Sequence, residues 1–174
     1  MANIYVTNGY MTAEMLETIR PCLDAANVDL KAFREETYRK YVGGRLKPVL
    51  ETMKKMKNLG IWLEVTTQVI PGINDGRAEL KYAAAFVSRE LGVDTPWHIS
   101  RFFPHYKMKE APPTPLETLY RAKRIGIEAG LRYVYVGNLT PRAAVPNAGR
   151  MTEGRKQLKW LILDNQTKCF VANA

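Results

Sequence analysis

IWLEVTTQVIPG, residues 61–72, holds the clearest structural signal in the chain. Branched and aromatic side chains fill most of this stretch, which ends abruptly at the turn pair Pro71-Gly72. A short apolar run of this composition, bounded by turn residues, is typical of a buried β-strand. Helical patterns lie on both sides of it, over 49–59 and 74–91. A strand enclosed by two helices indicates a repeating β-α unit.

The same alternation continues toward both ends of the chain. It predicts an α/β fold with a parallel sheet covered by helices, as in a Rossmann-like sheet or in a whole or partial (β/α) barrel. Two helix starts have candidate capping residues, Thr12 for the first and Asn74 or Asp75 for the helix after Gly72. The other predicted strands are 4–7, 26–30, 97–103 and 133–136, and the other predicted helices are 12–21, 34–41 and 116–129.

Length and composition are those of an ordinary globular domain, with 174 residues of which 46% are hydrophobic. Apolar runs stay shorter than the roughly 20 residues that a membrane-spanning helix needs. The first residues do not combine a basic region with a long apolar stretch, so we expect no secretory signal and a cytoplasmic location. The chain has two cysteines, Cys22 and Cys169, which we expect to be reduced there.

The formal net charge of +9 raises nucleic acid as a possible partner. The basic residues are scattered, however, and two of their groups fall on helical patterns, where a solvated face is the simpler interpretation. Sequences typical of RNA-recognition domains, zinc fingers or helix-turn-helix units are not found in the chain. We therefore expect neither nucleic acid nor a membrane as a partner.

Polar residues gather where the predicted strands end. In parallel β-α architectures, ligands bind at the carboxyl ends of the strands. Thr7-Asn8, Asp29 with Lys31, and Gln68 occupy such positions, and His105 follows the fourth strand. This placement predicts a cleft for a small polar ligand without naming a reaction. His98, within the fourth strand, is expected to be a hydrogen-bonded structural histidine.

Four of these strand-end segments, taken together and in order, resemble radical S-adenosylmethionine (SAM) enzymes of the pyruvate formate-lyase-activating type, in particular the AmmeMemoRadiSam branch. They are Thr7-Asn8-Gly9, Asp29-Leu30-Lys31, the turn Pro71–Asp75, and Trp97–Pro104. The resemblance implies that residues 1–138 form part of a radical SAM barrel, beginning at its third strand. Residues 139–174 then resemble a zinc-ribbon-like extension that has lost its cysteines.

The resemblance also implies a set of residues around SAM. Lys31 suits the ligand's carboxylate or ribose as a mobile point charge, and Val69 lies in the segment whose backbone approaches the adenine. Three alternatives stay open: Asn8 serves only turn geometry, Asp29 and Lys31 form a surface ion pair, and His105 lies on the surface of its loop. Cofactor-binding positions carried over from the family are Thr7, Asn8, Asp29, Lys31, Val69 and His105.

Several family features are missing from this sequence. The Cys-x-x-x-Cys-x-x-Cys motif that holds the [4Fe–4S] cluster is absent, and so is the Gly-Gly-Glu element. In the tail, Val145–Gly149 keeps the frame of a cysteine knuckle without its cysteines, and only Cys169 remains further on. We therefore expect this chain to bind neither cluster nor metal and to be inactive alone. Truncation of a longer enzyme and decay of a paralogue both explain the departures.

Two functions follow from the resemblance. The first is a fragment or degenerate form of a glycyl-radical-activating oxidoreductase, whose parent reaction is the reductive cleavage of SAM to a 5′-deoxyadenosyl radical. The partner of that parent is a glycyl-radical enzyme or another protein substrate. The alternative is a non-catalytic binding or assembly module that self-associates through the open edge of the barrel sheet.

Overall fold

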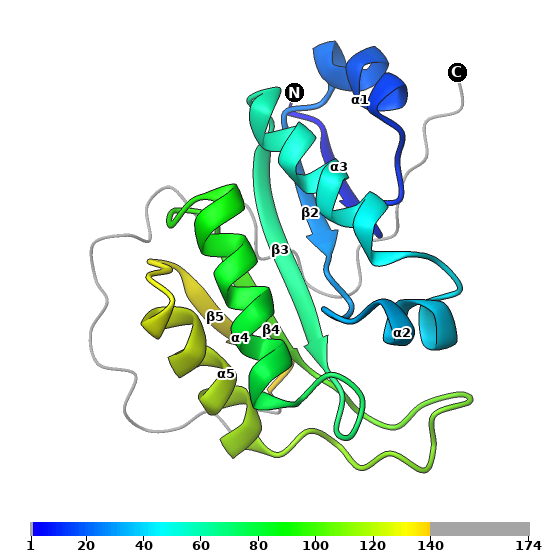
Figure 1. The fold of residues 1–174 in the computed structure, drawn as a ribbon, viewed down its shortest axis with the longest axis vertical. Helices are drawn as coiled ribbons and strands as arrows, with labels where there is room; N and C mark the ends of the chain where they lie inside the picture. Colours follow the sequence, from blue (N-terminus) through cyan, green and yellow to red (C-terminus); the bar gives the residue numbers. More distant parts are fainter. Residues whose placement is uncertain (1, 140–174) are drawn as a thin grey trace. The chain divides into compact units, whose positions relative to one another are not determined.

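The structure is a computed structural model that describes residues 2–139. Residues Met1–Leu139 form one compact unit, and the predicted tail, 139–174, lies almost entirely outside the described residues. Five strands alternate with the helices, as expected from the sequence (Figure 1). The strands are β1 (Ile4–Thr7), β2 (Ala25–Asp29), β3 (Trp62–Val69), β4 (Trp97–Arg101) and β5 (Val134–Gly137), and the helices are α1 (Ala13–Ile19), α2 (Glu35–Thr37), α3 (Leu46–Asn58), α4 (Arg77–Phe86) and α5 (Leu116–Glu128).

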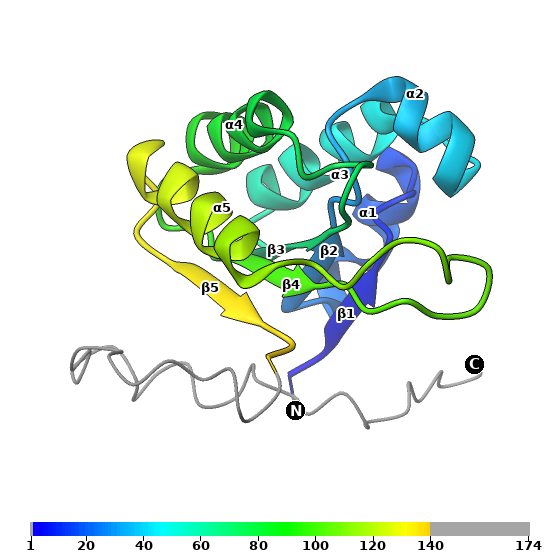
Figure 2. The same cartoon turned by 90° about the horizontal axis from the view of Figure 1, so that it is seen from below.

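All five strands are parallel and lie in the order β1-β2-β3-β4-β5, so each strand pairs with the next one along the chain. The helices of residues 2–139 all lie on one face of this sheet, and none of them lies on the other face, which we call the helix-free face (Figure 2). As far as residues 2–139 form it, the sheet is open, with β1 and β5 at its edges. The predicted α/β class and the partial, unclosed barrel are therefore confirmed.

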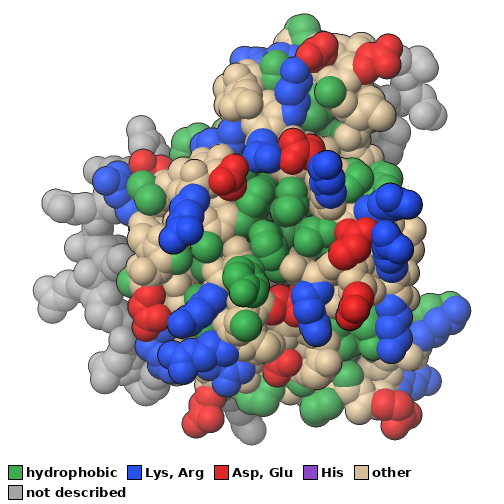
Figure 3. Space-filling model, in the orientation of Figure 1, with side chains coloured by type: hydrophobic (Ala, Val, Ile, Leu, Met, Phe, Trp, Pro, Cys, Tyr) green, Lys and Arg blue, Asp and Glu red, His purple; other side chains and the backbone are tan. Residues whose placement is uncertain are grey.

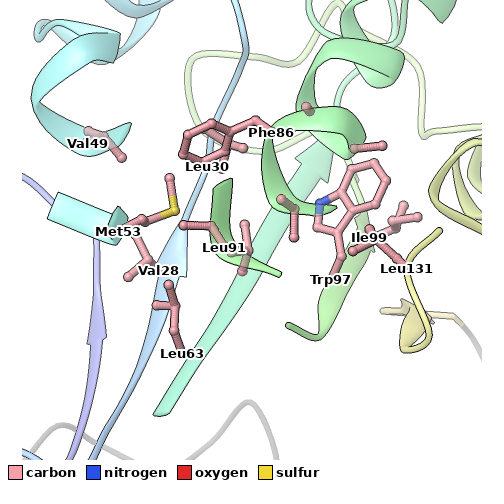
Figure 4. Close-up of a cluster of buried hydrophobic side chains, with 14 of the residues drawn as sticks. Val28, Leu30, Val49, Met53, Leu63, Phe86, Leu91, Trp97, Ile99 and Leu131 are labelled. Atoms are coloured by element: carbon pink, nitrogen blue, oxygen red, sulfur yellow. The ribbon is translucent and has the colours of Figure 1, made fainter. Parts of the chain in front are cut away.

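The hydrophobic core lies between the sheet and its helices (Figure 4). In β3 the side chains of Leu63, Val65, Thr67 and Val69 alternate toward the helices and are buried. Trp97, which is fully buried on β4, donates from its indole Nε1 to Thr67 Oγ1 at 3.0 Å. That hydrogen bond satisfies the indole polar group inside the core.

One of the two predicted helix caps is confirmed and the other is wrong. Thr12 Oγ1 accepts a hydrogen bond from Met15 N at 3.1 Å, as an N-cap should. Helix α4, however, begins after Gly76 with no side-chain cap. Asn74 and Asp75 instead accept hydrogen bonds from the backbone nitrogens of Ile70 and Gly72, within the turn that follows β3. Their oxygens are therefore used to close the turn rather than to start the helix.

Short π-helical segments extend two helices. Tyr38–Val42 continues α2 and ends at Gly43, whose φ of 73° is in the left-handed region that glycine adopts without strain. Val87–Leu91 continues α4 in the same way. Within residues 2–139, the helices are too short or too polar to cross a membrane.

Candidate functional site

The carboxyl ends of β1 and β2 place Thr7-Asn8 beside Asp29 and Lys31. Thr7 Oγ1 accepts from Gly9 N at 3.1 Å, and Asn8 Oδ1 accepts from Tyr10 N at 3.0 Å. Gly9 has a φ of 71°, and a Cβ on it would lie 2.6 Å from Val28 Cγ1 in the core. The turn at Asn8-Gly9 therefore requires glycine at position 9. The side-chain oxygens of Thr7 and Asn8 both stabilise this turn by accepting hydrogen bonds from its backbone nitrogens.

Asp29 and Lys31 form an ion pair at the end of β2. Lys31 Nζ lies 2.9 Å from Asp29 Oδ2, and the two side chains are 41% and 36% exposed, respectively. An ion pair this accessible contributes little to stability. The alternative of a surface ion pair describes the structure correctly, but the same exposure leaves both charges open to a ligand.

The backbone beneath this pair is fixed by buried polar side chains. Asn74 Nδ2 donates to the carbonyls of Lys31 and Gln68, both at 2.7 Å, although Asn74 is only 2% exposed. Tyr38 Oη accepts from Lys31 N at 3.2 Å. Burial raises the pKa of the Tyr38 phenol to about 12, so the ring is neutral at physiological pH. The Lys31 peptide is therefore held from two sides.

Glu79, on the first turn of α4, holds the segment that follows Lys31. Its carboxylate accepts from Phe33 N at 2.8 Å and from Arg34 Nε at 2.6 Å, and Glu79 is only 7% exposed. Arg34 also donates to the carbonyl of Ile73, in the turn after β3. The loop after β2 is thus fastened to the turn after β3, which gives Lys31 a rigid base.

Val69 and His105 lie differently from the first four predicted positions. The side chain of Val69 is fully buried in the core, and its carbonyl accepts from Thr114 Oγ1 at 2.6 Å. His105 is exposed in the long loop between β4 and α5, and within residues 2–139 no contact joins its ring to Asp29 or Lys31. The structure therefore brings together Thr7, Asn8, Asp29 and Lys31 at one edge, but not His105.

Thr114 closes the base of that loop. Its hydroxyl accepts from Phe102 N at 2.9 Å, its backbone nitrogen donates to the Phe102 carbonyl at 3.1 Å, and its own carbonyl accepts from Arg101 Nε at 2.8 Å. Thr114 is completely buried. The two ends of the loop 103–113 are consequently held side by side by the hydrogen bonds between Phe102 and Thr114.

The helix-free face of the sheet carries a polar cluster of which the sequence predicted one feature, a hydrogen-bonded His98, but not its partner Glu64. Glu64 on β3 is 1% exposed, and its Oε2 lies 2.8 Å from Nε2 of His98 on β4. The His98 ring stacks on Tyr135 of β5 with centroids 5.3 Å apart. Partial burial raises the pKa of Tyr135, and Tyr133 and Glu64 add to the shift. The available signal was the strand period of two, which puts Glu64 and His98 on the face opposite the core.

The described residues do not form a recognisable metal-binding site. They contain no group of three or more His, Cys, Asp or Glu side chains able to hold an ion. Cys22 is exposed and free. Cys169 and the Val145–Gly149 frame lie outside the described residues.

The outer, helical face differs from the strand-end edge. Basic and acidic side chains are interspersed across it, around a central apolar area (Figure 3). A shallow hollow there is lined from the loop after β2 and from α3 and α4 by Phe33, Leu50, Tyr82, Ala85 and Phe86, with Glu51, Lys54, Arg89 and Glu90 also lining it. None of the predicted ligand-binding residues lies in this hollow.

Comparison with known proteins shows what the chain is similar to. Residues 2–82 match the family model of the Radical SAM superfamily. The chain is 42% identical to the uncharacterized protein MJ0808 of Methanocaldococcus jannaschii, and the match covers 97% of this chain and 51% of that protein. The chain therefore spans about half the length of the curated relative that it matches.

Solved structures share the fold. A domain of pyruvate-formate lyase-activating enzyme from Bacteroides vulgatus superposes with a TM-score of 0.65 at 15% identity, over 76% of this chain and 80% of that one. A radical SAM methyltransferase from Sphaerobacter thermophilus superposes with a TM-score of 0.60 at 14% identity, over 77% of this chain and 39% of that one. At such identities the likeness concerns the fold alone.

Proposed function

We propose, from the match of residues 2–82 to the family model of the Radical SAM superfamily, that this chain carries the SAM-binding edge of a radical SAM protein of the pyruvate formate-lyase-activating type. The observation that supports this best is the exposed Asp29–Lys31 pair on a rigid base at the end of β2. The parent reaction is the reductive cleavage of SAM, and a glycyl-radical enzyme or another protein is the partner on which the parent acts.

The chemistry of the edge suits such a ligand. SAM presents a carboxylate, an ammonium group and ribose hydroxyls. The Lys31 ammonium can pair with the carboxylate or donate to a hydroxyl, and Asp29 can accept from a hydroxyl or from the ammonium. Because Asn74, Tyr38 and Glu79 fix the backbone, little conformational freedom is lost when the ligand binds.

The [4Fe–4S] cluster of such proteins does not fit the residues described here. It needs three cysteine thiolates, and Cys22 is the only cysteine among residues 2–139. When bound, the cluster supplies the electron for cleavage of SAM. We therefore assign this chain a binding role and propose that it is a fragment or degenerate form with no cleavage activity of its own.

Calorimetric titration of the chain with SAM tests the proposal. Lys31→Met should weaken binding by about tenfold, as expected when a charge-assisted hydrogen bond is lost. Lys81→Met, on the exposed surface of α4, removes the same charge away from the edge and should leave the affinity unchanged. Absence of SAM binding by the unmodified chain at millimolar ligand would contradict the proposal.

A second function, assembly through the edge strand β1, is favoured by one observation. Ile4, Tyr5 and Val6 are 39%, 40% and 70% exposed on a strand that, among residues 2–139, pairs on one side only. Apolar edge strands of this kind pair readily with further strands. Light scattering after size exclusion should detect self-association, and Val6→Lys should abolish it. A monomer at all concentrations would exclude this alternative.

A further inference from the structure

The helix-free face of the sheet carries one row of polar side chains that crosses four strands. Backbone pairing places Asp29 opposite Thr66, Thr66 opposite His98, and His98 opposite Tyr135. Paired residues on neighbouring strands point to the same face, at a spacing of about 5 Å. The row therefore runs from the proposed ligand edge at Asp29 to the imidazole of His98, on the face that carries no helix of residues 2–139 (Figure 2).

Glu64 is the unusual member of this face. It lies next to the row, opposite Asn27, and is only 1% exposed. Both of its carboxylate oxygens are engaged, Oε2 with His98 Nε2 at 2.8 Å and Oε1 with Trp62 Nε1 at 3.4 Å. A buried carboxylate requires such partners, because an unpaired charge there is very costly. The buried carboxylate of Glu64 is thus the centre of this cluster, and packing of the hydrophobic core does not explain why a carboxylate lies there.

The hydrogen bond from His98 Nε2 to Glu64 determines which tautomer the neutral His98 ring adopts. A carboxylate only accepts, so neutral His98 carries its proton on Nε2 and keeps the lone pair on Nδ1. Within residues 2–139, Nδ1 has no hydrogen-bond partner, and the His98 side chain is 28% exposed. Stacking on Tyr135 further fixes the ring plane. A buried acid, an oriented imidazole and an open ring nitrogen form the same arrangement as the acid-histidine pair of a general base.

We propose that His98 Nδ1 is the proton acceptor for a small-molecule substrate that carries an ionisable O–H or N–H group and binds on the helix-free face. The substrate's proton moves to Nδ1 and its electron pair stays on the substrate oxygen or nitrogen. The resulting imidazolium is balanced by Glu64, which acts as a positioning residue across the Nε2–H bond. Among residues 2–139, Glu64 on β3 bonds the His98 ring and Tyr135 on β5 stacks on it, whereas Asp29 on β2 lies two strands away in the same row.

This site rests on the proposed function in one respect only. Asp29, at the far end of the row, is also a proposed contact of SAM, so the two ligands would lie side by side. The geometry of Glu64 and His98 does not involve SAM. The two proposals can therefore fail independently.

Acylation by diethyl pyrocarbonate is a direct probe, because it requires an accessible, unprotonated imidazole nitrogen. The chain contains only two histidines, so His105, exposed in its loop, is an internal reference. Peptide mass spectrometry gives the modification rate of each histidine without any SAM present. We expect His98 to react, and Glu64→Gln to slow its reaction severalfold while the rate at His105 stays the same. An amide in place of the carboxylate no longer stabilises the developing charge.

Two further measurements keep the test decisive. Glu35→Gln neutralises another hydrogen-bonded carboxylate, on α2 and away from His98, and should not change the ratio of the two rates. In the unmodified chain, long-range ¹H–¹⁵N spectra should find the proton of neutral His98 on Nε2, whether or not the variants fold. A proton on Nδ1, or a His98 that stays unmodified while His105 reacts fully, would overturn the proposal. Equal rates in folded Glu64→Gln and unmodified protein would do the same.

Discussion

Asn74 Nδ2 donates a hydrogen bond to the backbone carbonyl of Lys31 at 2.7 Å. The two residues are 43 positions apart, yet the turn after β3 directly holds the loop after β2. The same amide donates to Gln68 O, and its oxygen accepts from Ile70 N. One buried side chain therefore joins two strand ends, and the position of Lys31 depends on Asn74, which is itself buried.

Asn74→Ala should lower the free energy of unfolding by about 3 kcal/mol. The substitution leaves the carbonyls of Lys31 and Gln68 and the nitrogen of Ile70 without a partner in a buried place, and each such loss is costly. Urea denaturation followed by circular dichroism measures the change. Asn74→Asp, which keeps the size but loses both donated protons, should be destabilising to a similar degree. Asp75→Ala, which removes one exposed turn bond, should cost less than about 1 kcal/mol.

Thr114→Val should destabilise the chain by about 2 kcal/mol with almost no change of side-chain shape. The hydroxyl accepts from Phe102 N and donates to Val69 O at a completely buried position, and valine offers neither interaction. Thermal unfolding would register the loss as a lower midpoint. Thr18→Val removes an exposed hydroxyl bonded only to its own helix at Glu14 O, and it should have little effect. Equal midpoints for the two variants would contradict the role given to Thr114.

Tyr38 should make stability fall with pH in the alkaline range. Its pKa in the folded chain is about 12, raised mainly by burial, whereas an unfolded tyrosine titrates near its ordinary value of about 10. The neutral phenol stabilises the fold fully below pH 10, and this contribution is lost as the pH rises from about 10 through about 12. The loss amounts to roughly 2–3 kcal/mol. Comparison with Tyr38→Phe isolates it, since the difference in stability between the two proteins should change only in that interval.

Gly126 on α5 packs directly against the sheet. A Cβ there would lie 3.0 Å from both Trp97 Cε3 and Val134 Cγ2, and both of these side chains are buried in the core. Gly126→Ala should therefore destabilise by about 1–2 kcal/mol, because overpacking outweighs the gain in helix propensity. Gly137→Ala at the end of β5 meets no atom within 4 Å and serves as the control. A more stable Gly126→Ala chain would show that α5 can shift away from the sheet.

Local patterns were sufficient to predict the architecture. Apolar strands ending at turn pairs, and helices ending at glycines, depend on neighbouring residues, so β3 and the capping by Thr12 were predicted correctly. The capping by Asn74 was predicted wrongly, because its oxygen has several possible backbone partners and the packing of two loops selects among them. Periodicity could not reveal that Glu64 would find His98, since that pairing depends on which strands become neighbours.

At the carboxyl end of β2, the sequence correctly placed Asp29 and Lys31 together, since two residues that are two apart at a strand end project to the same side. His105 was harder to place. It belongs to a loop of 11 residues between Phe102 and Thr114, whose path is not determined by any repeating pattern. The rigid base beneath Lys31 was also not predictable, because Glu79 and Tyr38 look like ordinary helix residues in the sequence.

The strand order β1-β2-β3-β4-β5 has a consequence for how the protein is made. Each strand from β2 to β5 pairs with the strand translated just before it. Its pairing partner has therefore already been synthesised when the strand leaves the ribosome. Each newly emerged helix and strand can dock onto the edge already in place. Biosynthesis of this domain can therefore proceed by stepwise growth at a single edge, in the direction of translation.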